Sequence, residues 1–304
     1  MTRAGSRWMR AAAGVALLGA ALLVDTAPVA AAPVPLGGLD VVFVYGEASS
    51  SSVSPKQARA VCPPGKVVLG GGGWVWASIP ADDRYIVMTQ AQPVHSSTVS
   101  GYFVTGTEVA GGLDGWWGVD AFALCGNRPA GYAVVDDPRP FSSTALKEAI
   151  AECPDGKRVL GTGARIDNSG GQVTLQTARS DGSRGIGRAV AKEDADGYAG
   201  NWSVTATTVC ADPRSGFTIV YGASVATGSE NVKSASVDCP SGTVIHNVGA
   251  SVSGTPAGLH TAPPGVAVLD LNPEGGGRSA HAYAVESTPT DINWDLVVQV
   301  VCGP

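Results

Sequence analysis

Cys62-Pro63-Pro64-Gly65-Lys66-Val67-Val68-Leu69-Gly70 decides the fold, because the chain repeats this stretch twice. The copies read Cys153-Pro154-Asp155-Gly156-Lys157-Arg158-Val159-Leu160-Gly161 and Cys239-Pro240-Ser241-Gly242-Thr243-Val244-Ile245. In each copy one Gly follows the Cys by three positions, a second by ten, and an aliphatic residue by thirteen. A spacing kept across three copies indicates a repeat architecture, which outweighs the local propensity of any one segment.

The three repeats span residues 38–127, 131–212 and 216–304. Each opens on a run of β-branched and aromatic residues, and each has a Lys six positions before its first Cys: Lys56, Lys147 and Lys233. Segment 145–151 of the second repeat would by itself be read as a helix, whereas its counterpart 232–237 would not. Because equivalent positions should share a conformation, we expect a strand there in all three repeats.

The strand that closes each repeat carries the clearest pattern. Trp117, Trp202 and Trp294 each precede the second Cys of their repeat by eight positions. Eight is even, so on a strand the Trp and the Cys point to the same face. The residues between them at that parity are almost all apolar, and polar residues such as Asp120 occupy the other face. The pattern predicts three buried core anchors rather than three ligand-stacking residues.

The composition is that of a folded, turn-rich β protein. The 304 residues include 41 Gly and 20 Pro; 44% are hydrophobic and only 15% are charged. Disorder needs the opposite, high charge and low hydrophobicity. Repeats of about ninety residues are long enough for a complete six-stranded sandwich each. We therefore predict an all-β fold of three tandem, disulfide-stapled, β-sandwich-like repeats, which could pack about a pseudo-threefold axis.

Residues 1–31 have the features of a secretory signal peptide. Arg3, Arg7 and Arg10 precede an apolar run from Ala11 to Val24, which is shorter than a membrane span needs. Its removal takes away three Arg and one Asp and changes the formal charge from −6 to −8. We expect a secreted, extracellular protein with no membrane span. An acidic chain without a basic cluster does not favour nucleic acid as a partner.

Six Cys in a secreted chain are expected to form disulfides. They allow fifteen pairings, but each repeat owns one Cys before its Gly-rich strand and one at the end of its Trp strand. Because equivalent repeats should pair alike, we predict the disulfides Cys62–Cys125, Cys153–Cys210 and Cys239–Cys302. Each closes a loop of about sixty residues, worth roughly 4 kcal/mol in the chain-entropy model. No C-x-x-C pair is present, so we expect neither a metal site nor a cofactor.

The sequence favours a non-enzymatic extracellular binding or surface-associated protein over an enzyme, and no catalytic residue is assigned. It contains no G-x-S-x-G elbow, no H-E-x-x-H and no Gly-rich loop that opens a helix. Segment 70–73, which is all Gly, is interpreted as a strand or bulge covered by a bulky side chain such as Trp117. The main alternative is an extracellular hydrolase that uses the third repeat, with His246, His260 or His281. An enzyme inhibitor that presents its loops is another.

Each repeat also has one Glu before its Trp: Glu108, Glu193 and Glu286. Paired with the matched Lys of its repeat, this Glu would form an ion pair at a strand end, worth under about 1 kcal/mol if exposed. The alternative is a repeated binding spot. We favour the ion pair, because catalytic carboxylates normally come as two acids rather than as an acid and a Lys.

Two loop tips of the first repeat, 81–84 and 113–116, are the candidate binding site. Their polar residues include Asp83, Arg84 and Asp114. Trp116 is the member of the Trp116-Trp117 pair that should point outward, an orientation that suits stacking on a sugar ring. We expect an extracellular ligand, either a glycan such as a cell-wall polymer or a protein.

The motif set resembles tandem modules of uncharacterised secreted proteins from high-GC Gram-positive bacteria. It consists of K-x-A-x-[AV]-x-C-P-x-G, a Gly ten positions after the Cys, and W-x7-C. The resemblance covers nearly all of residues 38–304 and implies module identity without an activity. The third repeat departs from it, with Thr243 in place of the Lys and His246 in place of the Leu.

The threefold repetition also resembles the β-prism of egg vitelline membrane outer-layer proteins. That resemblance implies three sheets around a pseudo-threefold axis. The length of the repeats instead favours a complete sandwich for each.

Overall fold

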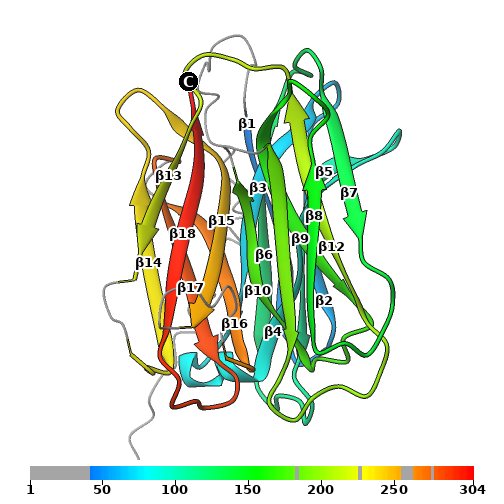
Figure 1. Ribbon diagram of the computed structural model, residues 1–304, viewed down its shortest axis with the longest axis vertical. Helices are drawn as coiled ribbons and strands as arrows, with labels where there is room; N and C mark the ends of the chain where they lie inside the picture. Colours follow the sequence, from blue (N-terminus) through cyan, green and yellow to red (C-terminus); the bar gives the residue numbers. More distant parts are fainter. Residues whose placement is uncertain (1–41, 182–184, 225–227, 255–262, 275–276) are drawn as a thin grey trace, which may run out of the picture. The chain divides into compact units, whose positions relative to one another are not determined.

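Three six-stranded antiparallel sheets make up the structure, a computed structural model that describes residues 42–181, 185–224, 228–254, 263–274 and 277–304 (Figure 1). The predicted signal peptide (1–31), the first residues of repeat 1 and His260 lie outside the described residues. The described ranges contain one short 3-10 helix, η1 (Pro80–Tyr85). Within those ranges, no helix is long and apolar enough to cross a membrane. The predicted all-β class is confirmed.

Each repeat contributes six strands in the same order. Repeat 1 forms β1 (Val42–Ser51), β2 (Lys56–Val61), β3 (Val67–Ala77), β4 (Ile86–His95), β5 (Ser100–Glu108) and β6 (Trp117–Gly126). Repeat 2 forms β7 (Ala133–Pro138), β8 (Leu146–Glu152), β9 (Arg158–Asp167), β10 (Val173–Asp181), β11 (Ile186–Glu193) and β12 (Ser203–Ala211). Repeat 3 forms β13 (Thr218–Ala223), β14 (Val232–Asp238), β15 (Val244–Gly254), β16 (Val266–Glu274), β17 (Ser279–Glu286) and β18 (Trp294–Gly303).

Every sheet is shared by two repeats. Sheet A has the order β1-β6-β3-β16-β17-β14, sheet B has β2-β5-β4-β9-β12-β7, and sheet C has β13-β18-β15-β10-β11-β8. The joints between repeats are the pairs β3–β16, β4–β9 and β10–β15, each with two paired residues per strand. Each joint covers a strand edge that would otherwise be open to pairing with another chain.

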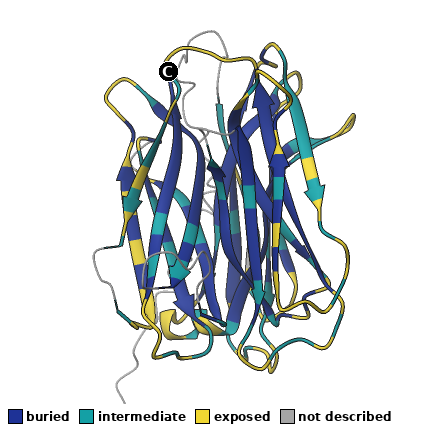
Figure 2. Ribbon diagram, in the orientation of Figure 1, coloured by how far each residue is buried: buried dark blue, intermediate teal, exposed yellow. Residues whose placement is uncertain are grey.

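Within a repeat, the two three-stranded halves pack face to face as a sandwich. In repeat 1, β1 contacts β2, and β3 contacts β4. The predicted sandwich-like repeats are therefore present, and their layers continue into the neighbouring repeats. Figure 2 shows that buried residues run along the central strands and that exposed residues gather in the loops at the strand ends.

The inward faces follow the predicted parity. Trp117, Trp202 and Trp294 are fully buried. In β8, Lys147, Ala149 and Ala151 are buried and alternate with more exposed neighbours, so segment 145–151 is a strand and not a helix. Each of the three Trp is thus a core residue of its own repeat.

The three predicted disulfides are present. Cys62–Cys125, Cys153–Cys210 and Cys239–Cys302 form, with Cα–Cα distances of 5.5, 5.7 and 5.7 Å. In each, the first Cys directly follows the second strand of its repeat (β2, β8 or β14), and the second Cys lies near the end of the Trp strand, which belongs to the other layer. The bond therefore ties together the two layers of one sandwich.

The Gly-rich segment of β3 is a bulged strand under aromatic rings. A Cβ on Gly71 would lie 2.5 Å from the ring of Tyr102, and one on Gly72 would lie 2.5 Å from the ring of Phe122. The prediction that Trp117 covers this segment is wrong. Trp117 packs instead over Gly106 of β5, where a Cβ would come within 2.8 Å of its ring.

Each Gly-rich strand contains a β-bulge at the same position of the repeat. The extra residues are Leu69 in β3, Leu160 in β9 and His246 in β15. A bulge turns its extra side chain away from the regular alternation. These three strands contact one another, and Leu69 and Leu160 belong to one small hydrophobic cluster. The ring of His246 meets Phe217, which packs against the same cluster, at 4.7 Å edge-to-face.

Candidate functional site

The two loop tips predicted as a binding site lie side by side. Ser78 donates hydrogen bonds to the carbonyl of Trp116 from its backbone N–H at 2.8 Å and from its hydroxyl at 2.7 Å. The Trp116 side chain is 66% exposed, so it is available to a ligand. Asp114 is also exposed.

The two remaining predicted loop residues make contacts within the protein. Arg84 donates to the hydroxyl of Tyr85 at 2.7 Å and lies over its ring. Asp83 accepts a hydrogen bond from Ala77 N–H at 2.8 Å, which fixes η1 against the end of β3. Asp83 also bonds Tyr283 of the third repeat, so the loop site continues onto sheet A.

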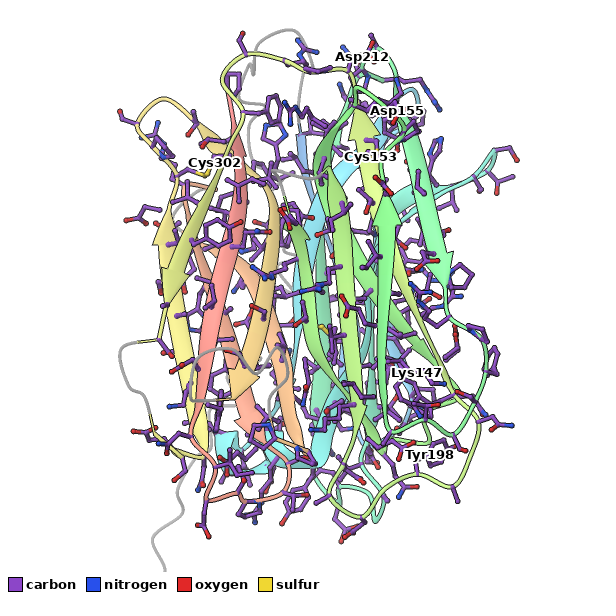
Figure 3. The ribbon with its side chains drawn as sticks, in the orientation of Figure 1. Lys147, Cys153, Asp155, Tyr198, Asp212 and Cys302 are labelled. Carbon is purple, nitrogen blue, oxygen red and sulfur yellow. A yellow bond between two sulfur atoms is a disulfide. The ribbon has the colours of Figure 1, made fainter. Side chains whose placement is uncertain are left out.

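The matched Lys and Glu of each repeat hold its Trp in place. The indole N–H donates to the carboxylate in all three copies, at 2.8 Å to Glu108, 2.9 Å to Glu193 and 2.8 Å to Glu286. The second carboxylate oxygen accepts a backbone N–H from the following loop, such as that of Tyr198 in repeat 2. Figure 3 labels Lys147 and Tyr198 at this end of repeat 2.

On the face of each Trp lies the ammonium group of the matched Lys. It stands 3.7, 4.2 and 5.0 Å from the ring centroid in repeats 1, 2 and 3. Lys56 and Lys147 also donate to the backbone carbonyls of Trp117 and Trp202. Burial lowers the pKa of Lys56, and the charge of Glu108 partly opposes that shift.

The expected Lys–Glu ion pair is therefore wrong in detail. In the first two repeats no salt bridge joins the described Lys and Glu, which contact different parts of the Trp. Hydrogen bonds to a buried indole and a cation over its ring are structural contacts. We call this unit the Trp brace, and its role is to fix the core of each sandwich.

One sheet carries a row of acidic and aromatic residues on its outward face. Across sheet A, Glu47 of β1 pairs with Asp120 of β6, which pairs with Trp74 of β3. Trp74 pairs across the joint with Asp270 of β16, which pairs with Tyr283 of β17. Directly opposed residues on neighbouring strands point to the same face. These five residues, the acidic row, form a continuous line over two repeats.

Further contacts extend the acidic row to both sides. The indole of Trp76 donates to Asp120 Oδ2 at 2.7 Å. The imidazole of His281 lies with Nδ1 3.3 Å from Asp270 Oδ2. The row and the loop tips thus form one surface, because Tyr283 at the end of the row bonds Asp83 of η1.

The electrostatics of this face are acidic. Among the six strands of sheet A, the only Lys or Arg is Lys233, which lies over the ring of Trp294 inside the sandwich. Partial burial raises the pKa of Asp120, opposed by the Trp76 bond, and burial also raises the pKa of Asp270. The hydrogen bond to Asp270 raises the pKa of His281. A face of this charge favours neutral or cationic ligands over anionic ones.

The equivalent rows of the other two sheets have different chemistry. Sheet B has Thr205, Arg165, Gln90 and Thr105 at the positions of Asp120, Trp74, Asp270 and Tyr283. Sheet C has Val297, Ser251, Thr177 and Val190 there. The same backbone forms in all three cases, so the fold does not require acids and aromatics at these positions.

Sequence reasoning missed most of the acidic row. Asp120 was assigned to the outward face, but Trp74, Asp270 and Tyr283 were not proposed as site residues. A usable signal was present in Trp74-Val75-Trp76, because Val75 is buried and its two neighbours must point the other way. The pairing of β3 with β16 across repeats could not be read from spacing.

The two described His residues of the hydrolase alternative, His246 and His281, lie in different surroundings. His281 lies beside a carboxylate, whereas His246 is fully buried. Within the described ranges, no group of three or more His, Cys, Asp or Glu side chains is arranged to hold a metal ion.

No protein-family model matches this chain, and no curated protein is similar to it at a significant level.

Proposed function

We propose that this is a secreted, non-enzymatic protein that binds a polysaccharide on the outward face of sheet A. The observation that carries the proposal is the acidic row. In sheet A, Trp74 lies between Asp120 and Asp270. The equivalent positions of sheets B and C hold no acidic or aromatic residue, although their strands pair in the same way.

The chemistry of the row suits a sugar. An aromatic ring packs against the apolar face of a sugar ring, and carboxylates on either side accept hydrogen bonds from its hydroxyl groups. Because the strands of sheet A place no Lys or Arg on their outward face, an anionic polymer would be repelled there. We therefore favour a neutral or amine-bearing polysaccharide, because an ammonium group would also be attracted to the indole and the carboxylates.

The loop tips would extend the same surface. Trp116 is exposed, and its loop is tied to η1, which in turn contacts β17 of sheet A. A polymer that follows the sheet would meet Trp116 at the strand end. Three disulfides support the secreted location, since such bonds persist outside reducing compartments.

The test is a binding assay of the mature, oxidised protein with insoluble chitin, cellulose and purified peptidoglycan, followed by calorimetry on soluble fragments of any polymer that binds. Trp74→Arg places the sheet B residue in sheet A, and we expect it to weaken binding by about tenfold or more. Trp116→Ala should weaken it less. Arg165→Gln on sheet B is the matched control and should leave it unchanged. Absence of binding to all three polymers would reject the proposal.

A second candidate function is hydrolysis of the same class of ligand. It is favoured by the contact between Asp270 and His281 and by the presence of two carboxylates, Asp120 and Asp270, on one face. Paired acids are the usual machinery of glycoside hydrolysis. Release of reducing ends from a bound polymer, abolished by Asp270→Asn, would support it.

A further inference from the structure

A cavity of about 420 Å³ opens on the outward face of sheet B. Gln90, Gln92 and Phe103 of repeat 1 line it together with Asp136 and Arg165 of repeat 2. Small-molecule sites usually fall between roughly 300 and 1,000 Å³. The cavity is thus large enough for a sugar, and its lining includes Arg165 and Gln90, the counterparts of Trp74 and Asp270 in the acidic row of sheet A.

Two buried amides present donors to this cavity. Gln90 and Gln92 are 8% and 6% exposed. The Oε1 of Gln90 accepts from Gln57 Nε2 at 2.9 Å and from Thr105 at 2.7 Å, and the Oε1 of Gln92 accepts from Thr207. No hydrogen bond joins either Nε2 group to another described residue, and neither group is fully covered. Since the oxygens are occupied, each amide offers its NH₂ to a ligand.

Two arginines add charged donors. Arg165 uses its Nε to bond Asp167 at 2.9 Å. Arg59 bonds Gln57 through its Nε, and its guanidinium lies 5.2 Å from the ring centroid of Phe103. In both residues the terminal NH₂ groups make no other hydrogen bond to the described chain.

Acceptors are few in the cavity. Asp136 is the one carboxylate in its lining, and its Oδ1 accepts a hydrogen bond from Thr207 at 2.6 Å. The second titratable group, His95, lies with its Nε2 2.9 Å from the guanidinium of Arg128, and burial together with that charge lowers its pKa. The free groups that line the cavity are therefore mainly donors.

We infer that this cavity is a second binding site, which takes the carboxylate of an acidic sugar such as a uronic acid. A carboxylate accepts paired hydrogen bonds from a guanidinium, the strongest polar contact of this kind. The amide donors of Gln90 and Gln92 would serve the ring oxygen and hydroxyl groups. This site lies on a different sheet from the acidic row and does not depend on the proposed function.

The experiment uses D-glucuronate as the probe and D-glucose as its neutral counterpart, with the oxidised full-length mature protein. Calorimetry measures affinity, and NMR of the side-chain NH₂ groups locates the site. We expect glucuronate to bind and to shift the Gln90 and Gln92 NH₂ signals. Arg165→Gln should weaken binding by about tenfold or more. Trp74→Arg on sheet A should leave it unchanged.

A second variant covers the buried part of the site. Gln92→Glu keeps the acceptor for Thr207 but replaces the donor with a charge that repels a carboxylate, so it should also abolish glucuronate binding. Equal affinity for glucose and glucuronate, or wild-type affinity in Arg165→Gln, would overturn the inference. Because Arg165→Gln leaves the acidic row intact, loss of uronate binding with retained polysaccharide binding separates the two proposals.

Discussion

Where sheet A has Trp74 between Asp120 and Asp270, sheet B has Arg165 between Thr205 and Gln90. The strands pair in the same order and register in both sheets. One outward face offers acids and aromatic rings, whereas the other offers amide and guanidinium donors around a cavity.

The residues on the inward side, by contrast, are alike in all three repeats. The Trp brace is made from the same three residue types in every repeat, with the same hydrogen bond from the indole to the Glu. The inward contacts therefore specify the fold. The outward residues are free to differ between sheets, and we expect the residues that bind a ligand to be among them.

The largest expected effect is the difference in lost stability between replacing an inward Trp and replacing an outward one. Trp202→Ala should lower the free energy of unfolding by about 3–5 kcal/mol, because it removes a buried indole and leaves a cavity. Trp74→Ala should lower the free energy of unfolding far less, since Trp74 is partly exposed. Urea unfolding of both variants checks this. Equal losses of stability would break the distinction between the two sides.

The junction of the Gly-rich strands provides a pH-dependent test. Burial lowers the pKa of His246 to about 3, and a hydrogen bond to the Pro304 backbone opposes this shift only in part. The unfolded chain, with a His pKa of 6.5, therefore binds the proton more readily. The stability that the neutral His246 contributes above pH 6.5 should therefore be lost as the pH falls from 6.5 towards about 3.

His246→Leu should remove this part of the acid sensitivity, because Leu69 and Leu160 occupy the same position in the other repeats. The difference between variant and wild type amounts to several kcal/mol at acidic pH, at about 1.4 kcal/mol for each pKa unit. Unfolding midpoints measured between neutral and acidic pH give the comparison. Parallel curves for the two proteins would show that His246 is not the responsible group.

A smaller effect is expected within the Trp brace. Glu193→Ala leaves the indole N–H of Trp202 buried without an acceptor, which should cost about 1–3 kcal/mol. Glu193→Gln keeps one oxygen for that N–H and should cost less. Thermal unfolding of the pair tests this, and identical melting temperatures would mean that the indole hydrogen bond contributes little.

Much of the inward structure was predictable from the sequence. Repeat spacing and strand parity predicted the three disulfides, the buried Trp and the strand at 145–151, because each follows from residues within one repeat. The partner of the brace Lys was not predictable. Residue types suggested a Lys–Glu pair, and only the fold shows that both contact the Trp.

The outward sites depended on contacts between repeats. Asp270 lies opposite Trp74, and Gln90 lies opposite Arg165, only because each sheet continues from one repeat into another. That joint consists of two paired residues per strand, and no spacing within one repeat encodes it. The loop tips around Trp116 could be proposed from sequence, but their continuity with the acidic row required Tyr283 to reach Asp83.

We propose that sheet A binds its ligand through outward residues that its backbone does not need. It is tested most directly by a triple variant that gives sheet A the sheet B residues: Asp120→Thr, Trp74→Arg and Asp270→Gln. Calorimetric titration of wild type and variant with the soluble fragment of the bound polysaccharide, beside urea unfolding of both, is the measurement. We predict a retained unfolding midpoint and lost binding. Undiminished binding by a folded triple variant would contradict the account.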